Sequence, residues 1–199
     1  MREPIDIVID TPNYVVRTLH ESDDMGNWGE WVADPNTARM LNTAVKKLTA
    51  DDFRAYVRRF DRINSHLLGI FRRTDDALVG MWSNYVDWPK SEFLINLIVG
   101  DVPDRKTHVR HETSWRVNRY FFEQLDLKFQ RATTLATNIP AIRALEEKKW
   151  SLAGNSMKAA ADGSGDVLIL LYTRSREVWK SQTPMSDEEL LGQGAARTG

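Results

Sequence analysis

The order of hydrophobic and polar positions along the chain predicts strands and helices that alternate through most of its length. Short runs rich in apolar and β-branched residues are typical of strands. They occupy residues 14–19, 66–71, 77–86, 92–99, 131–137, 152–160 and 166–174. The turn-forming sequence Thr74-Asp75-Asp76 separates the second run from the third, so these two are expected to pair as a hairpin.

Helical periodicity is clearest between Thr49 and Ile63. Apolar side chains recur there at the spacing of one helix face: Phe53, Tyr56, Val57, Phe60 and Ile63. Thr49 and Asp52 resemble a capping box at the start of this helix. Arg54, Arg58 and Arg62 form a basic row on the opposite face, for which a solvated surface is favoured over a binding role.

Further helices are predicted after Ser22, from Glu112 to Leu125 and from Asn138 to Lys149. Asn138 is a good N-cap residue, and Pro140 lies in the first turn, where a missing N–H is tolerated. The order of elements predicts a mixed α/β (α+β) fold: a central sheet of about seven strands, flanked by about four helices. Its second half needs a parallel crossover. Residues 1–174 are expected to form one domain, and 175–199 a C-terminal extension that is partly disordered.

Composition places the chain among globular proteins. It has 199 residues, of which 42% are hydrophobic and 28% charged, and its net charge is −1. A nucleic-acid binder normally carries a basic excess, so that partner is not expected. The sequence has no cysteine, no signal-peptide pattern and no apolar run of about 18 residues. These features predict a cytoplasmic protein that binds no membrane and, with its histidines scattered, no metal.

The stretch DRKTHVRHETSW at 104–115 is the first candidate for chemistry. It follows the strand-like run FLINLIVG and precedes a predicted helix, and a basic turn at a helix N-terminus is an arrangement that holds phosphates. Phosphate loops usually contain glycine, however, and none lies between Gly100 and the helix. The stretch alone therefore leaves two interpretations open, a phosphate loop without glycine and a solvated surface turn.

Several short motifs in the same order resemble the GNAT acyltransferase superfamily, most closely its branch of ribosomal-protein N-terminal acetyltransferases. The resemblance extends from Tyr14 to Tyr172. Its residues are Arg17 with Asp23, Asp34-Pro35 with Arg39, the helix ending YFFEQLDL at 120–127, and the series Asn138, Glu146, Trp150 and Gly154.

The resemblance implies a donor site for acetyl-CoA. The loop of the family that wraps the pyrophosphate falls on Arg105 to Glu112, with Lys106 and His108 at its two glycine positions. The implied cofactor-binding residues are Ile98, Val99, Arg105, Lys106, Val109, Arg110 and Asn138, where the strand residues would act through their main chain.

The implied function is acyl-CoA-dependent N-acetyl transfer to a primary amine on a small molecule or peptide. Glu92, at the start of the central strand, is the predicted general base, and Asp87 just before it is the other candidate. The alternative for both is a solvated carboxylate at a strand end. The positions that carry the acid in active relatives are Ala141 and Leu145 here, and neither can give a proton. The alternative is a catalytically impaired GNAT-fold binding module that no longer uses acetyl-CoA. The resemblance also makes a homodimer an expectation.

Overall fold

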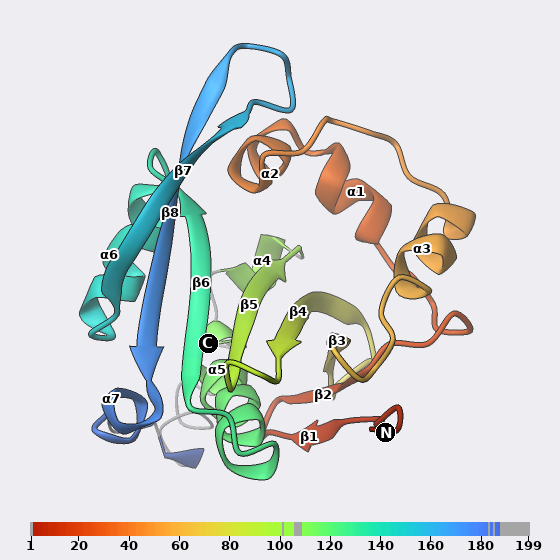
Figure 1. Ribbon diagram of the computed structural model, residues 1–199. Coiled ribbons are helices and arrows are strands. Elements are labelled where there is room, and N and C mark those ends of the chain that lie inside the picture. The colour runs from red at the N-terminus through yellow and green to blue at the C-terminus, as the bar shows by residue number, and fades with distance from the viewer. Residues whose placement is uncertain (1, 101, 106–108, 183, 185, 188–199) are drawn as a thin grey trace, which may run out of the picture.

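The computed structural model describes residues 2–100, 102–105, 109–182, 184, 186 and 187. In these residues one sheet of eight strands has the order β1-β2-β3-β4-β5-β6-β8-β7 (Figure 1). The strands are β1 Val8–Asp10, β2 Tyr14–Thr18, β3 Ser65–Arg72, β4 Leu78–Asp87, β5 Glu92–Val99, β6 Phe129–Leu135, β7 Ser151–Ala159 and β8 Asp166–Ser175. Only β5 and β6 run parallel, and every other neighbouring pair is antiparallel.

Helices cover both faces of the sheet. The described helices are α1 Trp28–Ala33, α2 Pro35–Leu41, α3 Ala50–Val57, α4 Val102–Arg105, α5 Val109–Arg119, the π-helical turn η1 Tyr120–Gln124, α6 Ile139–Glu147 and α7 Arg176–Lys180. Trp31 of α1 and Phe53 of α3 pack with Met81 in a core on one face. Val117 of α5 and Phe121 of η1 pack with Phe93 in the core on the other face. Neighbouring side chains of β4 and β5 thus enter different cores, as strand alternation requires.

Local sequence explains the helix ends. Thr49 accepts a hydrogen bond from the Asp52 N–H while the Asp52 carboxylate accepts one from the Thr49 N–H, so the predicted capping box is present. The Asn138 side chain accepts a hydrogen bond from the Ala141 N–H at 3.3 Å, which confirms the predicted N-cap of α6.

The structure confirms the predicted mixed α/β fold, and its eight strands exceed the predicted seven by β1. This strand was missed because it has three residues, too few to show a periodic pattern. The boundary expected after residue 174 is not a break in packing. Trp179 of α7 is buried and stacks on Trp115 with 4.4 Å between ring centroids, so α7 belongs to the core. No described helix has the length and apolar content needed to span a membrane.

Gly100 ends β5 at a point of close packing. Trp31 of α1 lies directly against it, and a Cβ atom added to Gly100 would stand 1.7 Å from the indole ring. Only glycine lets α1 approach the end of β5 this closely. The contact holds α1 beside the chain that leads from β5 to α5.

We predict that Gly100→Ala destabilises the protein because the buried Trp31 ring must move. Overpacking of this kind costs roughly 2 kcal/mol or more of the free energy of unfolding. Gly154→Ala is the matched control: no atom lies within 4 Å of its added Cβ, and the unfolded chain loses the same freedom. Urea unfolding of both variants measures the difference, and equal midpoints would refute the constraint.

Candidate active site

The two parallel strands of the sheet pair over only half their length. Their register runs from Glu92 beside Phe129 to Ile95 beside Ala132 and then stops. Beyond this point β5 continues to pair with β4, and β6 continues to pair with β8. The facing edges of the two strands therefore have no strand partner after Ile95 and Ala132, and their main-chain groups are available to a ligand.

A cleft of about 350 Å³ occupies this divergence. Its walls come from the separating strands, from α5 on one side and from α6 on the other. Residues of α2 and of the segment around α7 close its two ends. The principal lining residues are Met40, Leu41, Trp82, Ile95, Asn96, Leu97, Arg110, His111, Ser114, Trp115, Asn118, Thr133, Thr134, Asn138, Leu145, Lys148, Trp150, Arg174, Trp179 and Gln182.

The charge of this lining is one-sided. Arg110, Lys148 and Arg174 are cations, and His111 can become one, whereas no Asp or Glu of the described chain lines the cleft. The whole protein has 28 acidic residues against 27 basic ones, so the cleft departs from the average composition. A low-dielectric cleft lined by one sign of charge attracts ligands of the other sign. The cleft is therefore suited to an anion.

Helix α5 presents a polar row to the cleft. Arg110, Ser114 and Asn118 follow one another at intervals of four residues and lie on one helix face. Val109 and Val117 lie on a second face, which is buried against the sheet. The helix is thus enclosed on two sides, which explains why its sequence lacks the single apolar stripe of a surface helix.

The buried carboxylate of Glu112 anchors the start of α5. Its Oε1 accepts hydrogen bonds from Thr11 Oγ1 at 2.5 Å and from the Asn13 N–H at 2.6 Å, and its Oε2 accepts one from Asn13 Nδ2 at 2.9 Å. These donors belong to the turn between β1 and β2. Glu112 therefore fixes α5 to the edge of the sheet, and no ligand is needed to explain its burial.

Arg105 is also engaged by the protein. Its Nε donates to the Val99 carbonyl at 2.9 Å, and its terminal nitrogen donates to the Gly100 carbonyl at 3.1 Å and to Thr37 Oγ1 at 3.0 Å. The guanidinium thus ties the end of β5 to the first turn of α2. Two of the three guanidinium nitrogens, which the resemblance assigns to a phosphate, are thus engaged within the protein. Lys106 lies outside the described residues.

The structure brings two of the predicted cofactor-binding side chains together in the cleft. Arg110 is exposed at the second residue of α5, and its guanidinium lies 3.3 Å from the ring of His111. Asn138 lies across the cleft at the start of α6. Because α5 and α6 face each other over the diverging strands, a ligand that follows the gap would pass between these two residues.

Three other predicted positions do not contribute side chains to the cleft. Ile98 packs in the core with α1 and α3, while Val99 packs in the core with α5. Val109 is buried, which leaves it only main-chain groups for a ligand. On β5 the residues that line the cleft are instead Asn96 and Leu97, just before the predicted pair.

The predicted base Glu92 is buried at the start of β5. Its Oε2 lies 2.8 Å from Arg131 Nε, in an ion pair that lacks the angle of a hydrogen bond. Glu92 shares the strand face of Asn96 and is four residues away, which corresponds to about 13 Å. It lies outside the cleft lining, so a proton could reach it from the cleft only through intervening water.

Sequence reasoning missed Asn96, Ser114, Asn118 and Arg174 as cleft residues. Asn96 interrupts an otherwise apolar strand, which is a usable signal, since an unpaired polar side chain is costly in a core. Ser114 and Asn118 continue the helical spacing of Arg110. Arg174 carried no local signal because the residues that surround it come from distant parts of the chain.

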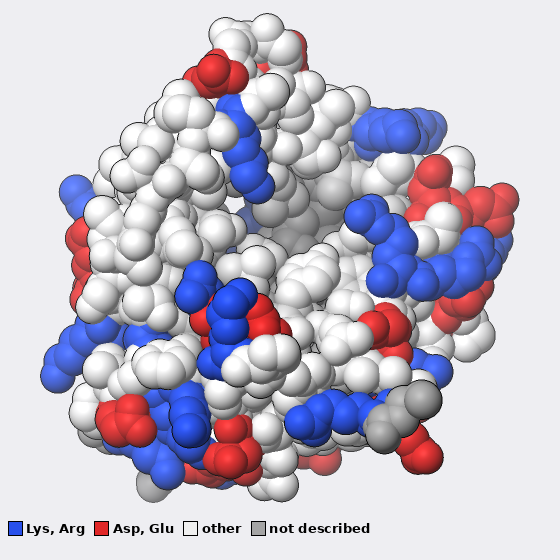
Figure 2. Space-filling model, viewed as in Figure 1, with Lys and Arg blue, Asp and Glu red and all other residues white. Residues whose placement is uncertain are grey.

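The hairpin of β7 and β8 leans toward α2 on the face that carries α1 to α3 (Figure 1). The Asn42 side chain, which follows α2, joins the two. Its Nδ2 donates to the Ala159 carbonyl at 3.1 Å, and its Oδ1 accepts from the Ala161 N–H at 2.9 Å. In the space-filling view the centre of this face is hollowed, with mostly uncharged walls (Figure 2). These two hydrogen bonds of Asn42, called the latch below, thus lie at the rim of the hollow.

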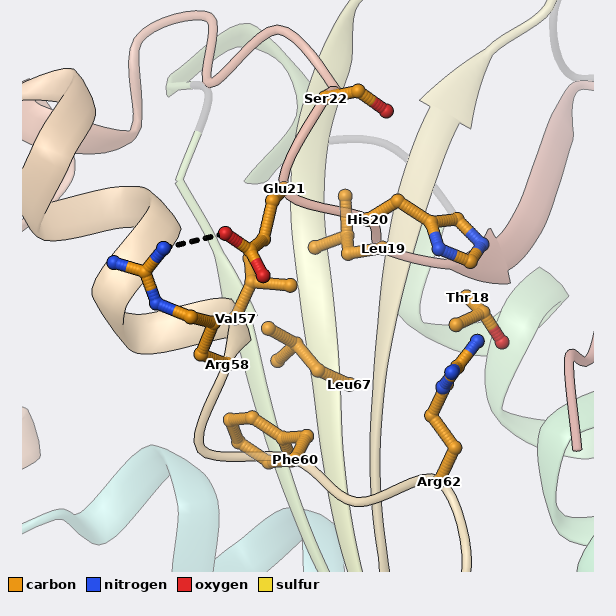
Figure 3. A pocket seen from close by; sticks show the side chains of 10 residues that line it. All are labelled: Thr18, Leu19, His20, Glu21, Ser22, Val57, Arg58, Phe60, Arg62 and Leu67. Atoms are coloured by element: carbon orange, nitrogen blue, oxygen red, sulfur yellow. Dashed lines mark hydrogen bonds and ion pairs between the residues drawn. The ribbon is translucent and has the colours of Figure 1, made fainter. Parts of the chain in front are cut away.

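A second hollow, of about 450 Å³, lies between α3 and the end of β2 (Figure 3). Arg58 and Arg62 of the predicted basic row border this hollow, and each pairs with an acidic neighbour. Arg58 pairs with Glu21 at 2.6 Å, and Arg62 pairs with Asp6 at 2.9 Å. Lysine, arginine and acidic side chains intermingle over this part of the surface (Figure 2). The favoured interpretation of a solvated face fits these exposed pairs.

Comparisons with solved structures identify the fold. An acetyltransferase of the GNAT family from Bacillus anthracis superposes with a TM-score of 0.68 at 16% identity, covering 86% of this chain and 99% of that chain. A ribosomal-protein-S5-alanine acetyltransferase from Vibrio fischeri gives 0.73 at 12% identity, covering 87% and 99%. A RimL ribosomal L7/L12 alpha-N-protein acetyltransferase gives 0.68 at 15% identity, covering 86% and 95%. No family model and no curated protein matches the sequence. The chain has the GNAT fold.

We predict that Asn42→Gly loosens the hairpin while leaving the core intact. Asn42 has a φ of 47°, which glycine adopts without strain, so this variant removes only the two side-chain hydrogen bonds. Amide exchange at the hairpin tip should accelerate on the order of tenfold, as expected for about 1–2 kcal/mol of lost hydrogen bonding. Lys158→Ala, in the same hairpin, is the control. Unchanged exchange in Asn42→Gly would show that the latch does not restrain the hairpin.

Proposed function

We propose that the protein is an acyl-CoA-dependent N-acetyltransferase that moves an acetyl group from acetyl-CoA to a primary amine. The observation that carries this proposal is the divergence of β5 and β6 beside a cleft with cationic and no acidic side chains. The GNAT fold of the chain and its structural similarity to acetyltransferases support the same function.

The residues of the cleft suit the donor. The pantetheine arm carries amide groups, which the unpaired edge of β5 at Asn96 and Leu97 can satisfy as an additional strand would. The phosphates need positive charge, which Arg110 and the N-terminus of α5 supply, and His111 lies beside Arg110. Arg105, which is bound to Val99, Gly100 and Thr37, instead holds the chain before α5 in place.

The reaction requires a small number of groups. The amine nitrogen forms a bond to the thioester carbon, the carbon–sulfur bond breaks, and the departing thiolate takes a proton. Main-chain N–H groups at the unpaired edge of β5 can stabilise the developing oxyanion. Ser114, Thr133 and Thr134 supply hydroxyl groups to the cleft, where Ala141 and Leu145 supply none. Glu92 remains the proposed base for the amine, acting through water.

The acceptor is a small-molecule or peptide amine that enters from the face with α1 to α3. The entrance for the acceptor is the hollow that Figure 2 shows, next to the hairpin and α2. The largely uncharged walls give a neutral or weakly charged acceptor no electrostatic barrier. The alternative, a binding module without catalysis, is supported by the absence of a hydroxyl at Ala141 and Leu145. Turnover measurements separate the two.

We predict that the protein binds acetyl-CoA in isothermal titration and that Arg110→Gln weakens this binding about tenfold. This is the loss expected for one charge-assisted hydrogen bond of roughly 1.5 kcal/mol. The affinity of the variant should also depend less on salt. Arg119→Gln is the matched control, because Arg119 is exposed on α5 but does not line the cleft.

Release of free CoA in the presence of a panel of amines then tests catalysis. Binding without release would favour the module, and absence of binding by the unaltered protein would overturn the proposal. Equal effects of Arg110→Gln and Arg119→Gln would show that Arg110 does not have the assigned role. A second variant, Ala144→Phe, tests the cleft itself by titration with acetyl-CoA. This variant places a ring in the cleft wall and should abolish binding.

A further inference from the structure

Arg174 on β8 is a cation held inside the protein. Its side chain reaches the cleft, yet the residue is only 6% exposed. No carboxylate of the described chain forms an ion pair with it, whereas Arg72, Arg116 and Arg131 each have one. A buried charge without a counterion is costly and needs a reason.

Among the described residues, Arg174 contacts neutral groups. Its Nε donates to Gln130 Oε1 at 2.7 Å, and one terminal nitrogen donates to Gln182 Oε1 at 3.3 Å. The guanidinium carbon lies 4.5 Å above the ring of Trp150. These contacts hold the plane of the guanidinium but leave its charge unbalanced. Burial lowers the pKa of Arg174 to about 9, which still leaves it a cation at neutral pH.

The donor-only character of Arg174 orients a chain of side-chain amides. Gln130 must turn its oxygen to Arg174, so its nitrogen faces away and donates to Asn118 Oδ1 at 2.5 Å. Asn118 must in turn present its oxygen to Gln130. Its nitrogen Nδ2 is then directed away from Gln130, and Asn118 itself lines the cleft.

Two sets of donors are left over at this end of the cleft. Among the described residues, neither Asn118 Nδ2 nor the second terminal nitrogen of Arg174 has a hydrogen-bond partner, and neither is sealed from the cleft. Gln182, which could have turned, is fixed because its own nitrogen donates to the Lys148 carbonyl at 2.6 Å. The side-chain groups left over from this network are thus hydrogen-bond donors beside one buried positive charge.

We propose that Arg174 and Asn118 form a subsite for a carboxylate group. A carboxylate has the single negative charge that balances one guanidinium, and its two oxygens match the donors of an arginine fork. A phosphate monoester would bring close to two charges, and the second would be left buried without a partner. The subsite is separate from Arg110, His111 and the start of α5, which serve the phosphates in the proposed function.

The carboxylate can reach the subsite from two sources. It can be the free end of a dicarboxylic acyl group carried on CoA, in which case the inference rests on the proposed function and changes the acyl group that the protein prefers. It can instead belong to a free carboxylic acid that binds in the cleft without CoA. The recognition chemistry is the same in both cases.

Isothermal titration with succinyl-CoA, acetyl-CoA and free succinate separates these sources. In the first case the unaltered protein binds succinyl-CoA at least tenfold more tightly than acetyl-CoA, and Arg174→Met removes the preference. In the second it binds succinate, and Arg174→Met abolishes that binding. Lys148→Met, which changes an exposed cation of the same cleft, is the matched control and should leave either result in place.

Thermal unfolding of the variants shows whether a loss of carboxylate binding comes from a damaged fold. Without ligand, Arg174→Met should change the melting temperature little, because it removes an unbalanced buried charge but also two hydrogen bonds. Asn118→Asp keeps the oxygen that accepts from Gln130 and adds an internal negative charge, so it should raise the melting temperature and block carboxylate binding.

Failure of the subsite differs from failure of the proposed function. Equal affinities for succinyl-CoA and acetyl-CoA without succinate binding would overturn the subsite and leave acetyl transfer standing. Lower melting temperatures for both Arg174→Met and Asn118→Asp would also overturn it, because the cation would then be part of the stabilising framework. Succinate binding that depends on Arg174, in a protein that ignores acetyl-CoA, would support the subsite and overturn the transferase.

Discussion

The early end of pairing between β5 and β6 is the feature on which the site depends. Each strand keeps its other neighbour, β4 or β8, so the sheet remains continuous while a gap opens inside it. Main-chain groups that would be satisfied in an ordinary sheet thus face a cleft. Contacts fix β5 at both of its ends. Trp31 against Gly100 and Arg105 against Val99 fix the end of β5, and the π-helical turn after α5 packs Phe121 beneath the strands where they still pair.

Most of the fold could be predicted from the sequence because its elements carry strong local signals. Seven strand-like runs, a capping box at Thr49 and an N-cap at Asn138 correspond to observed elements. The missed parts lack such signals. Strand β1 is short, and the role of Trp179 depends on a stacking partner, Trp115, that lies far away in the sequence. The contact of α7 with the core therefore had no local signal.

The site was less predictable because the sequence gives positions but not hydrogen-bond partners. Arg105 and Glu112 occupy the places that the resemblance implies, yet their side chains bind other parts of the protein. Arg110 and Asn138 do border the cleft. What distinguishes the two groups is the direction of each side chain after folding, which depends on the β1–β2 turn and on α2. Neither segment belongs to the loop from Arg105 to Glu112, so these contacts could not be predicted from the loop sequence.

Among the described residues, the cleft is lined by cations and by no Asp or Glu. Several basic residues outside the cleft pair with acidic ones, as Arg58 and Arg62 do, and Arg131 pairs with Glu92. Arg174 differs because its partners can orient it but cannot balance it. The hydrogen bonds to Gln130 and Gln182 hold the guanidinium in place, but they do not offset the cost of burying its charge. A ligand with one negative charge would balance the guanidinium of Arg174. It would bind beside the gap between β5 and β6.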